Sequence, residues 1–289
     1  MNFRTDLAIE RHEIISDSVP DGVKTEQYTA AGIKFTKICV ADDDGAKALD
    51  KPKGTYITAE LPPLSSFSPA DEEIVCAIAK ELRFLLPKEG TVLAVGLGNE
   101  DITPDAVGPK SVSMLLATRH LSNEIIKSTG LGNLRSAAAF IPGVTGKTGI
   151  ETAESIKGIV EAMKPSAVIA VDALAARKLS RLGTAIQISD TGISPGSGVG
   201  NTRSAVTHYT TGVPVISIGI PTVVDAETLI NDIIDEKNTF KSDESRAMMV
   251  TPREIDLVVE RAARLIGLSI NKALQPHLTV DELLMLTEK

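Results

Sequence analysis

The sequence predicts an α/β fold in which a mostly parallel or mixed sheet is flanked by helices. Three short apolar runs that are rich in β-branched residues have the composition of buried strands, at 92–95, 167–171 and 213–218. Segments with apolar side chains at helical spacing lie between and after these runs. Since strands and helices alternate along the chain, we expect one sheet with helices packed against its faces.

Three segments have the pattern of helices. The first begins with Ser68 as N-cap and Pro69 in the first turn, and it ends before Pro87. The second covers residues 156–163. The third, residues 252–274, carries apolar side chains along one face and predicts a long amphipathic helix.

The N-terminal part of the chain has a different pattern. Residues 32–40 and 54–61 predict two strands, and the polar residues 41–53 predict a loop between them. Residues 20–65 therefore form either a small β subdomain or an edge of the main sheet. The chain has no proline- or serine-rich linker and no internal repeat, so we expect a single domain.

Composition excludes several classes of function. The 289-residue chain has 30 Lys and Arg against 38 Asp and Glu, a net charge of −8, and only 3% aromatic residues without Trp. A surface for nucleic acid is therefore not expected. No apolar run reaches the ~18 residues of a membrane span, and the first residues lack the apolar core of a signal peptide. The two cysteines have no metal-ligand spacing, and the sequence predicts a cytoplasmic protein.

The loop after the first predicted strand is rich in glycine and carboxylates. Gly96 and Gly98 allow a tight turn or a close approach of the backbone. Asp101 stands where a dinucleotide-binding loop has its third glycine, so nucleotide binding is not predicted. Asp105 is either a carboxylate near a helix start or a functional group at the carboxyl end of the strand. The helix-start interpretation does not explain why Glu100 and Asp101 share the loop.

Asp172 directly follows the second predicted strand. A carboxylate at the tip of a buried strand is costly unless it is hydrogen-bonded, paired or used in function. It therefore has two interpretations, an N-cap of the following helix or a functional group. Further along the chain, the glycine-rich loop 191–201 is suited to lining a cleft or a subunit contact. The positions of interest in this loop are Gly196, Gly198 and Asn201.

Asp105 and Asp172 each follow an inner strand. If those strands are neighbours, the two carboxylates meet at one edge of the sheet. Two close carboxylates do not both ionise easily, so they share a proton. One then acts as a base toward water while the other supplies an acid. This chemistry suits peptide hydrolysis.

Two other patterns are incomplete. Residues 143–148 end in Gly-Lys-Thr, as a phosphate-binding loop does, but Ile141 stands where that loop has its first glycine. The four histidines form no pair at ligand spacing, so the sequence predicts no metal site.

Five segments carry longer motifs: residues 4–10, the loop 96–109, residues 142–152, the strand end at Asp172, and residues 196–201. In this order, and over essentially the whole chain, they resemble the spore germination proteases. That family consists of atypical aspartic peptidases whose fold is similar to that of the hydrogenase maturation proteases. Those relatives have Gly-x-Gly-Asn followed six residues later by a carboxylate, which is the spacing from Asn99 to Asp105.

The resemblance implies an endopeptidase with Asp105 and Asp172 as its catalytic pair and no metal or other cofactor. The loop residues Gly96, Gly98, Asn99 and Asp101 would shape the site. The substrates would be the small acid-soluble proteins that coat DNA in dormant spores, in the cytoplasm of the forespore and the spore core. A homotetramer is also implied.

The resemblance further implies an inactive precursor that processes itself. Residues 5–10 resemble the site that the family cuts in its substrates: Thr or Ser, Glu, a large apolar residue, Ala, a variable residue and Glu. The cut would fall between Asp6 and Leu7. Residues 1–6 would then be a propeptide, and residues 7–289 would be the peptidase domain.

Two other functions stay open at this point. One is a metal-dependent, nickel-sensing maturation protease, in which the two carboxylates bind the metal together with a histidine. The other is a non-catalytic α/β protein whose glycine-rich loops bind a small ligand or a partner.

Overall fold

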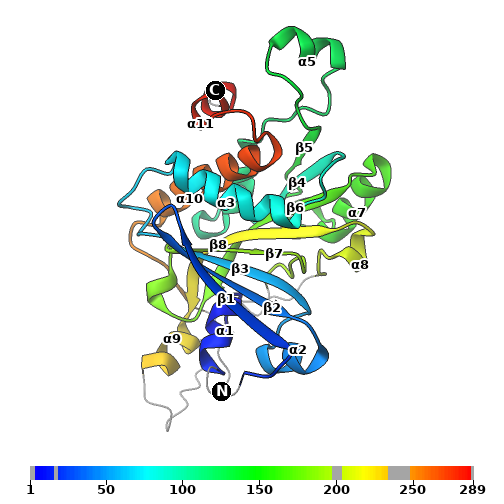
Figure 1. The fold of residues 1–289 in the computed structure, drawn as a ribbon. Coiled ribbons are helices and arrows are strands. Elements are labelled where there is room, and N and C mark those ends of the chain that lie inside the picture. Colours follow the sequence, from blue (N-terminus) through cyan, green and yellow to red (C-terminus); the bar gives the residue numbers. More distant parts are fainter. Residues whose placement is uncertain (1–3, 16–18, 197–203, 234–247, 288–289) are drawn as a thin grey trace.

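The computed structural model describes residues 4–15, 19–196, 204–233 and 248–287. Within them, one mixed sheet of nine strands runs through the molecule (Figure 1). Its order is β1-β2-β3-β7-β8-β6-β4-β5, and β9 pairs with β8 off this path. The strands are β1 (Val23–Ala30), β2 (Ile33–Val40), β3 (Gly54–Glu60), β4 (Val92–Gly96), β5 (Ala137–Phe140), β6 (Ala167–Ala176), β7 (Ala185–Ser189), β8 (Val215–Asp225) and β9 (Met249–Val250).

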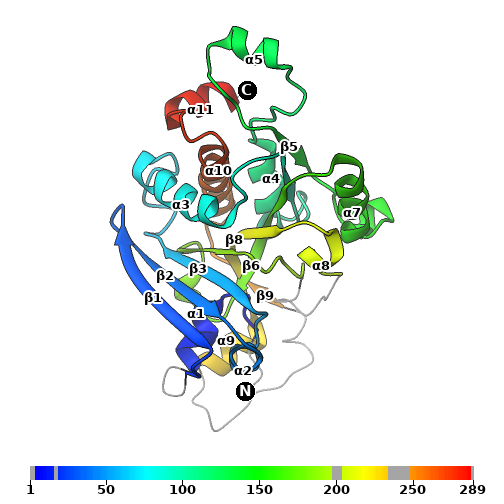
Figure 2. The same cartoon turned by 45° about the vertical axis from the view of Figure 1, so that its right-hand side comes forward.

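Different helices cover the two faces of the sheet (Figure 2). α3 (Glu72–Leu85), α4 (Val107–Ser113) and α10 (Ile255–Leu274) enclose an apolar cluster on one face. α7 (Thr152–Met163) packs on the opposite face, against β4 and β6. The other helices are α1 (Ala8–Ile14), α2 (Asp43–Leu49), α5 (Asn123–Thr129), α6 (Thr145–Thr148), α8 (His208–Thr211), α9 (Ala226–Ile233) and α11 (Val280–Thr287). Of the helices in the described ranges, none is both long and apolar enough to span a bilayer.

The side chains of the inner strands alternate between these two layers, as the pleat of a strand requires. In β4, Val92 and Ala94 join the cluster beneath α3 and α10. Leu93 and Val95 join the cluster beneath α7. Both faces are therefore apolar, which explains why the sequence of this strand is a continuous apolar run. The predicted α/β fold with a mixed sheet flanked by helices is confirmed.

Two of the predicted strands have different limits in the structure. β6 does not end at residue 171, because Asp172 to Ala176 continue to pair with β8. β8 begins at Val215, later than predicted, and continues to Asp225. Asp172 therefore lies inside a strand and not beyond its end.

The N-terminal strands are an edge of the main sheet. β3 pairs antiparallel with β7 from Tyr56 to Glu60. β1 was not predicted, and it forms a hairpin with β2. The predicted loop 41–53 contains α2, whose N-cap Asp42 accepts a hydrogen bond from the Gly45 N–H at 2.8 Å.

α3 begins later than predicted because its N-cap is Asp71. The Asp71 carboxylate accepts hydrogen bonds from the N–H groups of Glu73 and Ile74, at 3.0 and 3.2 Å. The Ser68 hydroxyl instead accepts a bond from the Ala70 N–H in the preceding turn. The carboxylate satisfies two of the free N–H groups that every helix start leaves.

At Gly108, α4 packs directly on the carboxyl end of β4 and on the middle of β6. A Cβ atom at this position would lie 2.1 Å from the Leu97 carbonyl oxygen and 2.4 Å from the Val171 carbonyl oxygen. Both neighbours are backbone atoms, in Leu97 directly after β4 and in Val171 of β6, so they have little freedom to move aside. This contact fixes the loop after β4 next to the segment of β6 that carries Asp172.

We predict that Gly108→Ala lowers the free energy of unfolding by at least about 2 kcal/mol, because its Cβ overlaps two strand carbonyls. Gly158→Ala is the matched control, since a Cβ there meets nothing within 4 Å in the middle of α7. It should raise the free energy of unfolding by about 0.5–1 kcal/mol through helix propensity. Urea denaturation of the two variants tests this, and equal midpoints would show that α4 adapts to the extra methyl group.

Candidate active site

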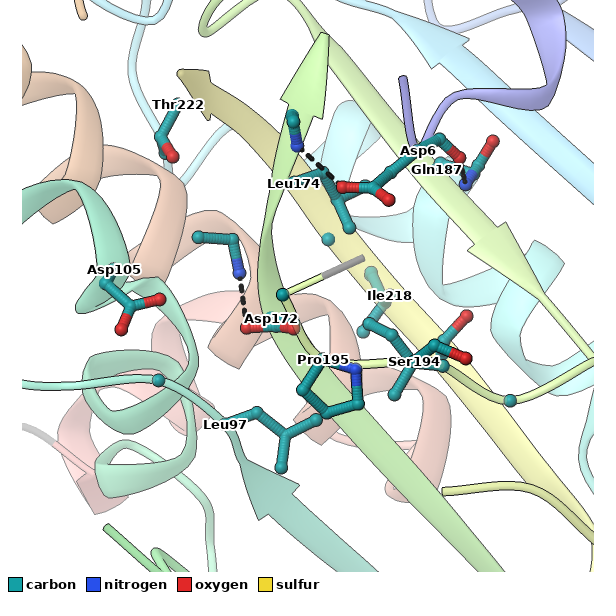
Figure 3. Close-up of a pocket in the computed structure, with 18 of the residues that line it drawn as sticks. Asp6, Leu97, Asp105, Asp172, Leu174, Gln187, Ser194, Pro195, Ile218 and Thr222 are labelled. Atoms are coloured by element: carbon teal, nitrogen blue, oxygen red, sulfur yellow. Dashed lines mark hydrogen bonds between the residues drawn. The ribbon is translucent and has the colours of Figure 1, made fainter. Parts of the chain in front are cut away.

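A cavity of about 580 Å³ lies at the carboxyl ends of the inner strands. Asp105 and Asp172 both line it, together with Asp6 from the N-terminal segment (Figure 3). The strands that precede the first two, β4 and β6, are adjacent and parallel. The neighbouring strands that the sequence argument required are therefore present, and they bring both carboxylates to one cavity.

Asp172 lies on β6 just beyond the last pairing of that strand with β4, which joins Gly96 to Val171. Its side chain is only 6% exposed, and its Oδ1 atom accepts a hydrogen bond from the Ala173 N–H at 2.9 Å. Since β6 continues to Ala176, the interpretation of Asp172 as the N-cap of a helix is wrong. Asp172 is instead a buried carboxylate in the wall of the cavity.

Asp105 closes the loop that follows β4. It ends a short 3-10 helix, Thr103–Asp105, and its Oδ2 atom accepts a hydrogen bond from the Asn99 N–H at 2.7 Å. Gly98 has φ +109°, and a Cβ there would lie 2.0 Å from the Asp105 carbonyl oxygen. Only glycine tolerates both conditions. The spacing between Asn99 and Asp105 is thus the length of a closed loop that orients the carboxylate.

Asp101 belongs to the same loop but does not line the cavity. Its carboxylate is 67% exposed and forms an ion pair with Lys147 of α6. The pair joins the loop after β4 to the 142–152 segment, from which Gly143 and Val144 reach the cavity. An exposed ion pair contributes little to stability.

The predicted glycines of the site have different positions. At Gly96, the last residue of β4, a Cβ would lie 2.4 Å from the Gly108 carbonyl oxygen, so this glycine permits the packing of α4. Gly196 lines the cavity and has φ +72°. Gly198 and Asn201 lie outside the described residues.

The N-terminal segment forms part of the cavity wall. Asp6 extends along β6: its N–H donates to the Ala175 carbonyl at 2.9 Å, and its Oδ2 atom accepts from the Ala175 N–H at 2.8 Å. Leu7 and Ala8 follow and are fully buried. Figure 3 shows Asp6 and Asp172 on either side of Leu174.

Lys51 and Gln187 bind the backbone of this segment, and the sequence analysis missed both. The Lys51 Nζ atom lies 3.1 Å from the Asp6 carbonyl oxygen, and the Gln187 Nε2 atom lies 2.9 Å from the same oxygen. Burial lowers the pKa of the Lys51 ammonium, and the nearby Asp6 carboxylate opposes this effect. In the sequence, Lys51 stands in a polar loop and Gln187 in an unpredicted strand, so no local pattern distinguishes either.

Hydroxyl groups also line the cavity. Ser189 on β7 is hydrogen-bonded to Ser217 on β8 at 2.8 Å and to Thr191 at 3.1 Å. Tyr56 on β3 also lines the cavity, and burial raises the pKa of its hydroxyl to about 12. Within the described residues, no group of three or more His, Cys, Asp and Glu side chains is placed to hold a metal ion.

A family model described as Germination protease matches residues 5–244. The chain belongs to the germination protease family. It is 43% identical to the germination protease of Caldanaerobacter subterraneus subsp. tengcongensis, over 98% of this chain and 97% of that protein. It is 41% identical to the germination protease of Clostridium perfringens, over 98% of each chain. With that of Priestia megaterium it shares 43% identity over 81% of this chain and 66% of the relative.

The family gives this chain a protease role in spore germination, and therefore a protein substrate. It does not favour the nickel-sensing maturation protease or the non-catalytic binding protein. Among solved structures, a [NiFe] hydrogenase maturation protease, HycI from Thermococcus kodakarensis KOD1, matches with a TM-score of 0.37 and 19% identity. That match covers 67% of this chain and 98% of the other.

Proposed function

We propose that this germination protease is an aspartic endopeptidase whose catalytic pair is Asp105 and Asp172. The observation that carries the proposal is that these two carboxylates line the same cavity. Asp105 follows β4 and Asp172 belongs to β6, and the two strands are adjacent and parallel. Each accepts a backbone hydrogen bond, from Asn99 and Ala173 respectively, so each is held in a defined orientation. Oriented carboxylates are what general acid–base catalysis requires.

In this proposal the two carboxylates share one proton. The ionised member takes a proton from water, and the water oxygen bonds to the carbonyl carbon of the substrate peptide. The protonated member then donates its proton to the peptide nitrogen, and the carbon–nitrogen bond breaks. The products are a new carboxyl group and a new amino group.

The proposed substrates are small acid-soluble spore proteins and the N-terminal segment of the protease itself. Residues 1–6 would be a propeptide, removed by a cut between Asp6 and Leu7 that leaves residues 7–289. The location of Asp6 in the cavity wall supports this assignment, since it places the segment in the cavity that the two aspartates line. We also propose a homotetramer in the spore cytoplasm, as the family resemblance implies.

We predict that Asp105→Asn and Asp172→Asn each lower kcat on a small acid-soluble spore protein by at least about 10³-fold. Asparagine is nearly isosteric with aspartate but does not take up the proton. The double variant should lose little more than either single one, because paired catalytic groups act as a unit. Circular dichroism should show folded proteins. Near-wild-type turnover in either folded variant would remove that residue from the pair.

We predict that Asp101→Asn lowers kcat by about fivefold or less, because an exposed ion pair is worth at most about 1 kcal/mol. Lys147→Met breaks the same pair from the other side and should have the same effect. The same cleavage assay measures both. A loss as large as that of Asp105→Asn, seen only for Asp101→Asn, would identify Asp101 as the catalytic carboxylate.

We predict that the wild-type chain acquires a single new N-terminus at Leu7 and that Asp172→Asn does not. The physical reason is that Asp6 and Asp172 line the same cavity, as the proposed cleavage after Asp6 requires. Intact-mass measurement of both proteins over time detects the loss of residues 1–6. Ragged N-termini that appear equally in both proteins would instead indicate trimming of an exposed end by other proteases.

A further inference from the structure

The carbonyl oxygen of Asp6 is bound by two side chains. It accepts hydrogen bonds from Lys51 Nζ at 3.1 Å and from Gln187 Nε2 at 2.9 Å. The two donors come from different elements, since Lys51 lies in the loop between α2 and β3 and Gln187 lies on β7. One hydrogen bond would be enough to hold a backbone carbonyl in place. The Lys51 Nζ atom also lies 3.3 Å from the Thr5 carbonyl oxygen. Two side-chain donors on the Asp6 oxygen, one of them a lysine, form an arrangement that can stabilise a negative charge on that atom.

Gln187 also fixes the direction of the peptide. Its Oε1 atom accepts a hydrogen bond from the Ala8 N–H at 2.6 Å, while its Nε2 atom binds the Asp6 carbonyl. One side-chain amide therefore holds the backbone on both sides of Leu7. Neither contact involves the side chain of the residue between them, so Gln187 recognises the peptide backbone alone.

The two donors face the same cavity as the proposed catalytic pair. Lys51 and Gln187 line it together with Asp105 and Asp172. Gln187 pairs across the sheet with Gly219, and Gly219 pairs with Asp172. Gln187 and Asp172 thus lie in one row on β7, β8 and β6, about 10 Å apart between their Cα atoms at the usual strand spacing. Figure 3 shows Gln187 beside Asp6 on the side of the cavity away from Asp105.

We propose that Lys51 and Gln187 stabilise the oxyanion that forms on the Asp6 carbonyl during self-processing, an assignment that rests on the proposed cleavage at Asp6–Leu7. When water adds to the carbonyl carbon, the π electrons of the C=O bond move to the oxygen that both side chains already contact. When the intermediate collapses, the C=O bond re-forms and the bond to the Leu7 nitrogen breaks. The Leu7 nitrogen takes a proton from the carboxylate pair, and Asp6 gains a new carboxyl group.

Other contacts fasten the same segment without touching this carbonyl. The Glu10 carboxylate accepts hydrogen bonds from the backbone N–H groups of Arg177 and Lys178, at 2.7 and 2.9 Å. The Lys178 ammonium pairs with Glu13 at 2.7 Å. The N-terminal segment therefore stays attached through Glu10 and Glu13 when Lys51 or Gln187 is replaced. A change in the cleavage rate of such a variant then reports on catalysis and not on attachment.

The test measures the rate of self-processing in the full chain by intact mass. Lys51→Met and Gln187→Leu should each slow the appearance of the Leu7 N-terminus by about 10²-fold, the usual effect of losing one oxyanion donor. Lys51→Arg, which keeps the charge, should retain part of the rate. Lys178→Met is the matched control, because it removes a lysine that holds the same segment but does not contact the carbonyl. Its rate should equal that of the wild type.

The pH dependence supplies a second readout. The charged groups around Lys51 are Asp6, Glu10 and Arg11 of the N-terminal segment and its neighbour Asp50. Because burial lowers the pKa of Lys51, the wild-type rate should fall at a lower alkaline pH than that of Lys51→Arg, whose guanidinium stays protonated. A common pH profile would overturn the role of the ammonium.

The alternative role, attachment alone, predicts the opposite sign. A loosened segment would then be cut at the wild-type rate or faster in Lys51→Met and Gln187→Leu, and that result would overturn the inference. Thermal unfolding identifies any variant that fails to fold, in which case Lys51→Arg and its pH profile decide. If the wild type never acquires the Leu7 N-terminus, the proposed self-processing fails and this inference fails with it. If the wild type is processed and Lys51→Met and Gln187→Leu are processed at the same rate, the inference fails while the proposed self-processing stands.

Discussion

The difference in length between β4 and β6 determines where the site lies. β4 ends at Gly96, whereas β6 continues to Ala176 because β8 still pairs with it. Along its final residues, β6 therefore has one edge that β4 does not cover. Asp172 is the first residue of this segment, and Asp6 binds the backbone of Ala175 further along it. One mismatch between parallel strands thus creates both the place of the carboxylate and the docking edge of the N-terminal segment.

Close backbone packing orients Asp105, the carboxylate that follows β4. Through Gly108, α4 contacts the end of β4 and the middle of β6. The loop between β4 and α4 closes through the Asn99 N–H and the Asp105 carboxylate. Gly98 makes that closure sterically possible. The orientation of Asp105 is therefore built from backbone contacts that a larger side chain at Gly98 or Gly108 would break.

The N-terminal segment is an integral part of the fold. The buried side chains of Thr5 and Glu10 have hydrogen-bond partners, as burial requires. The Glu10 carboxylate, only 1% exposed, binds two backbone N–H groups and the Thr5 hydroxyl. Leu7 joins the apolar cluster between α1 and the N-terminal strands. The proposed cut after Asp6 would remove the part of the cavity wall that Asp6 contributes and the Thr5 hydroxyl that binds Glu10.

The sequence by itself determined the class of fold and the identity of the two strands that carry the carboxylates. Buried strands such as 92–95 are local apolar runs. Asp105 belongs to a loop that a hydrogen bond to the Asn99 N–H closes, and the sequence spacing of these two residues sets the length of that loop. The amphipathic helices follow from local spacing for the same reason. Local sequence does not determine where β6 ends. Asp172 to Ala176 contain alanines and a leucine that suit a helix equally well, and only their pairing with β8 makes them a strand. Lys51 and Gln187 were decided by the tertiary structure alone. They are far from Asp6 in the chain, and a polar side chain acquires its partner only when distant strands fix the distance between them.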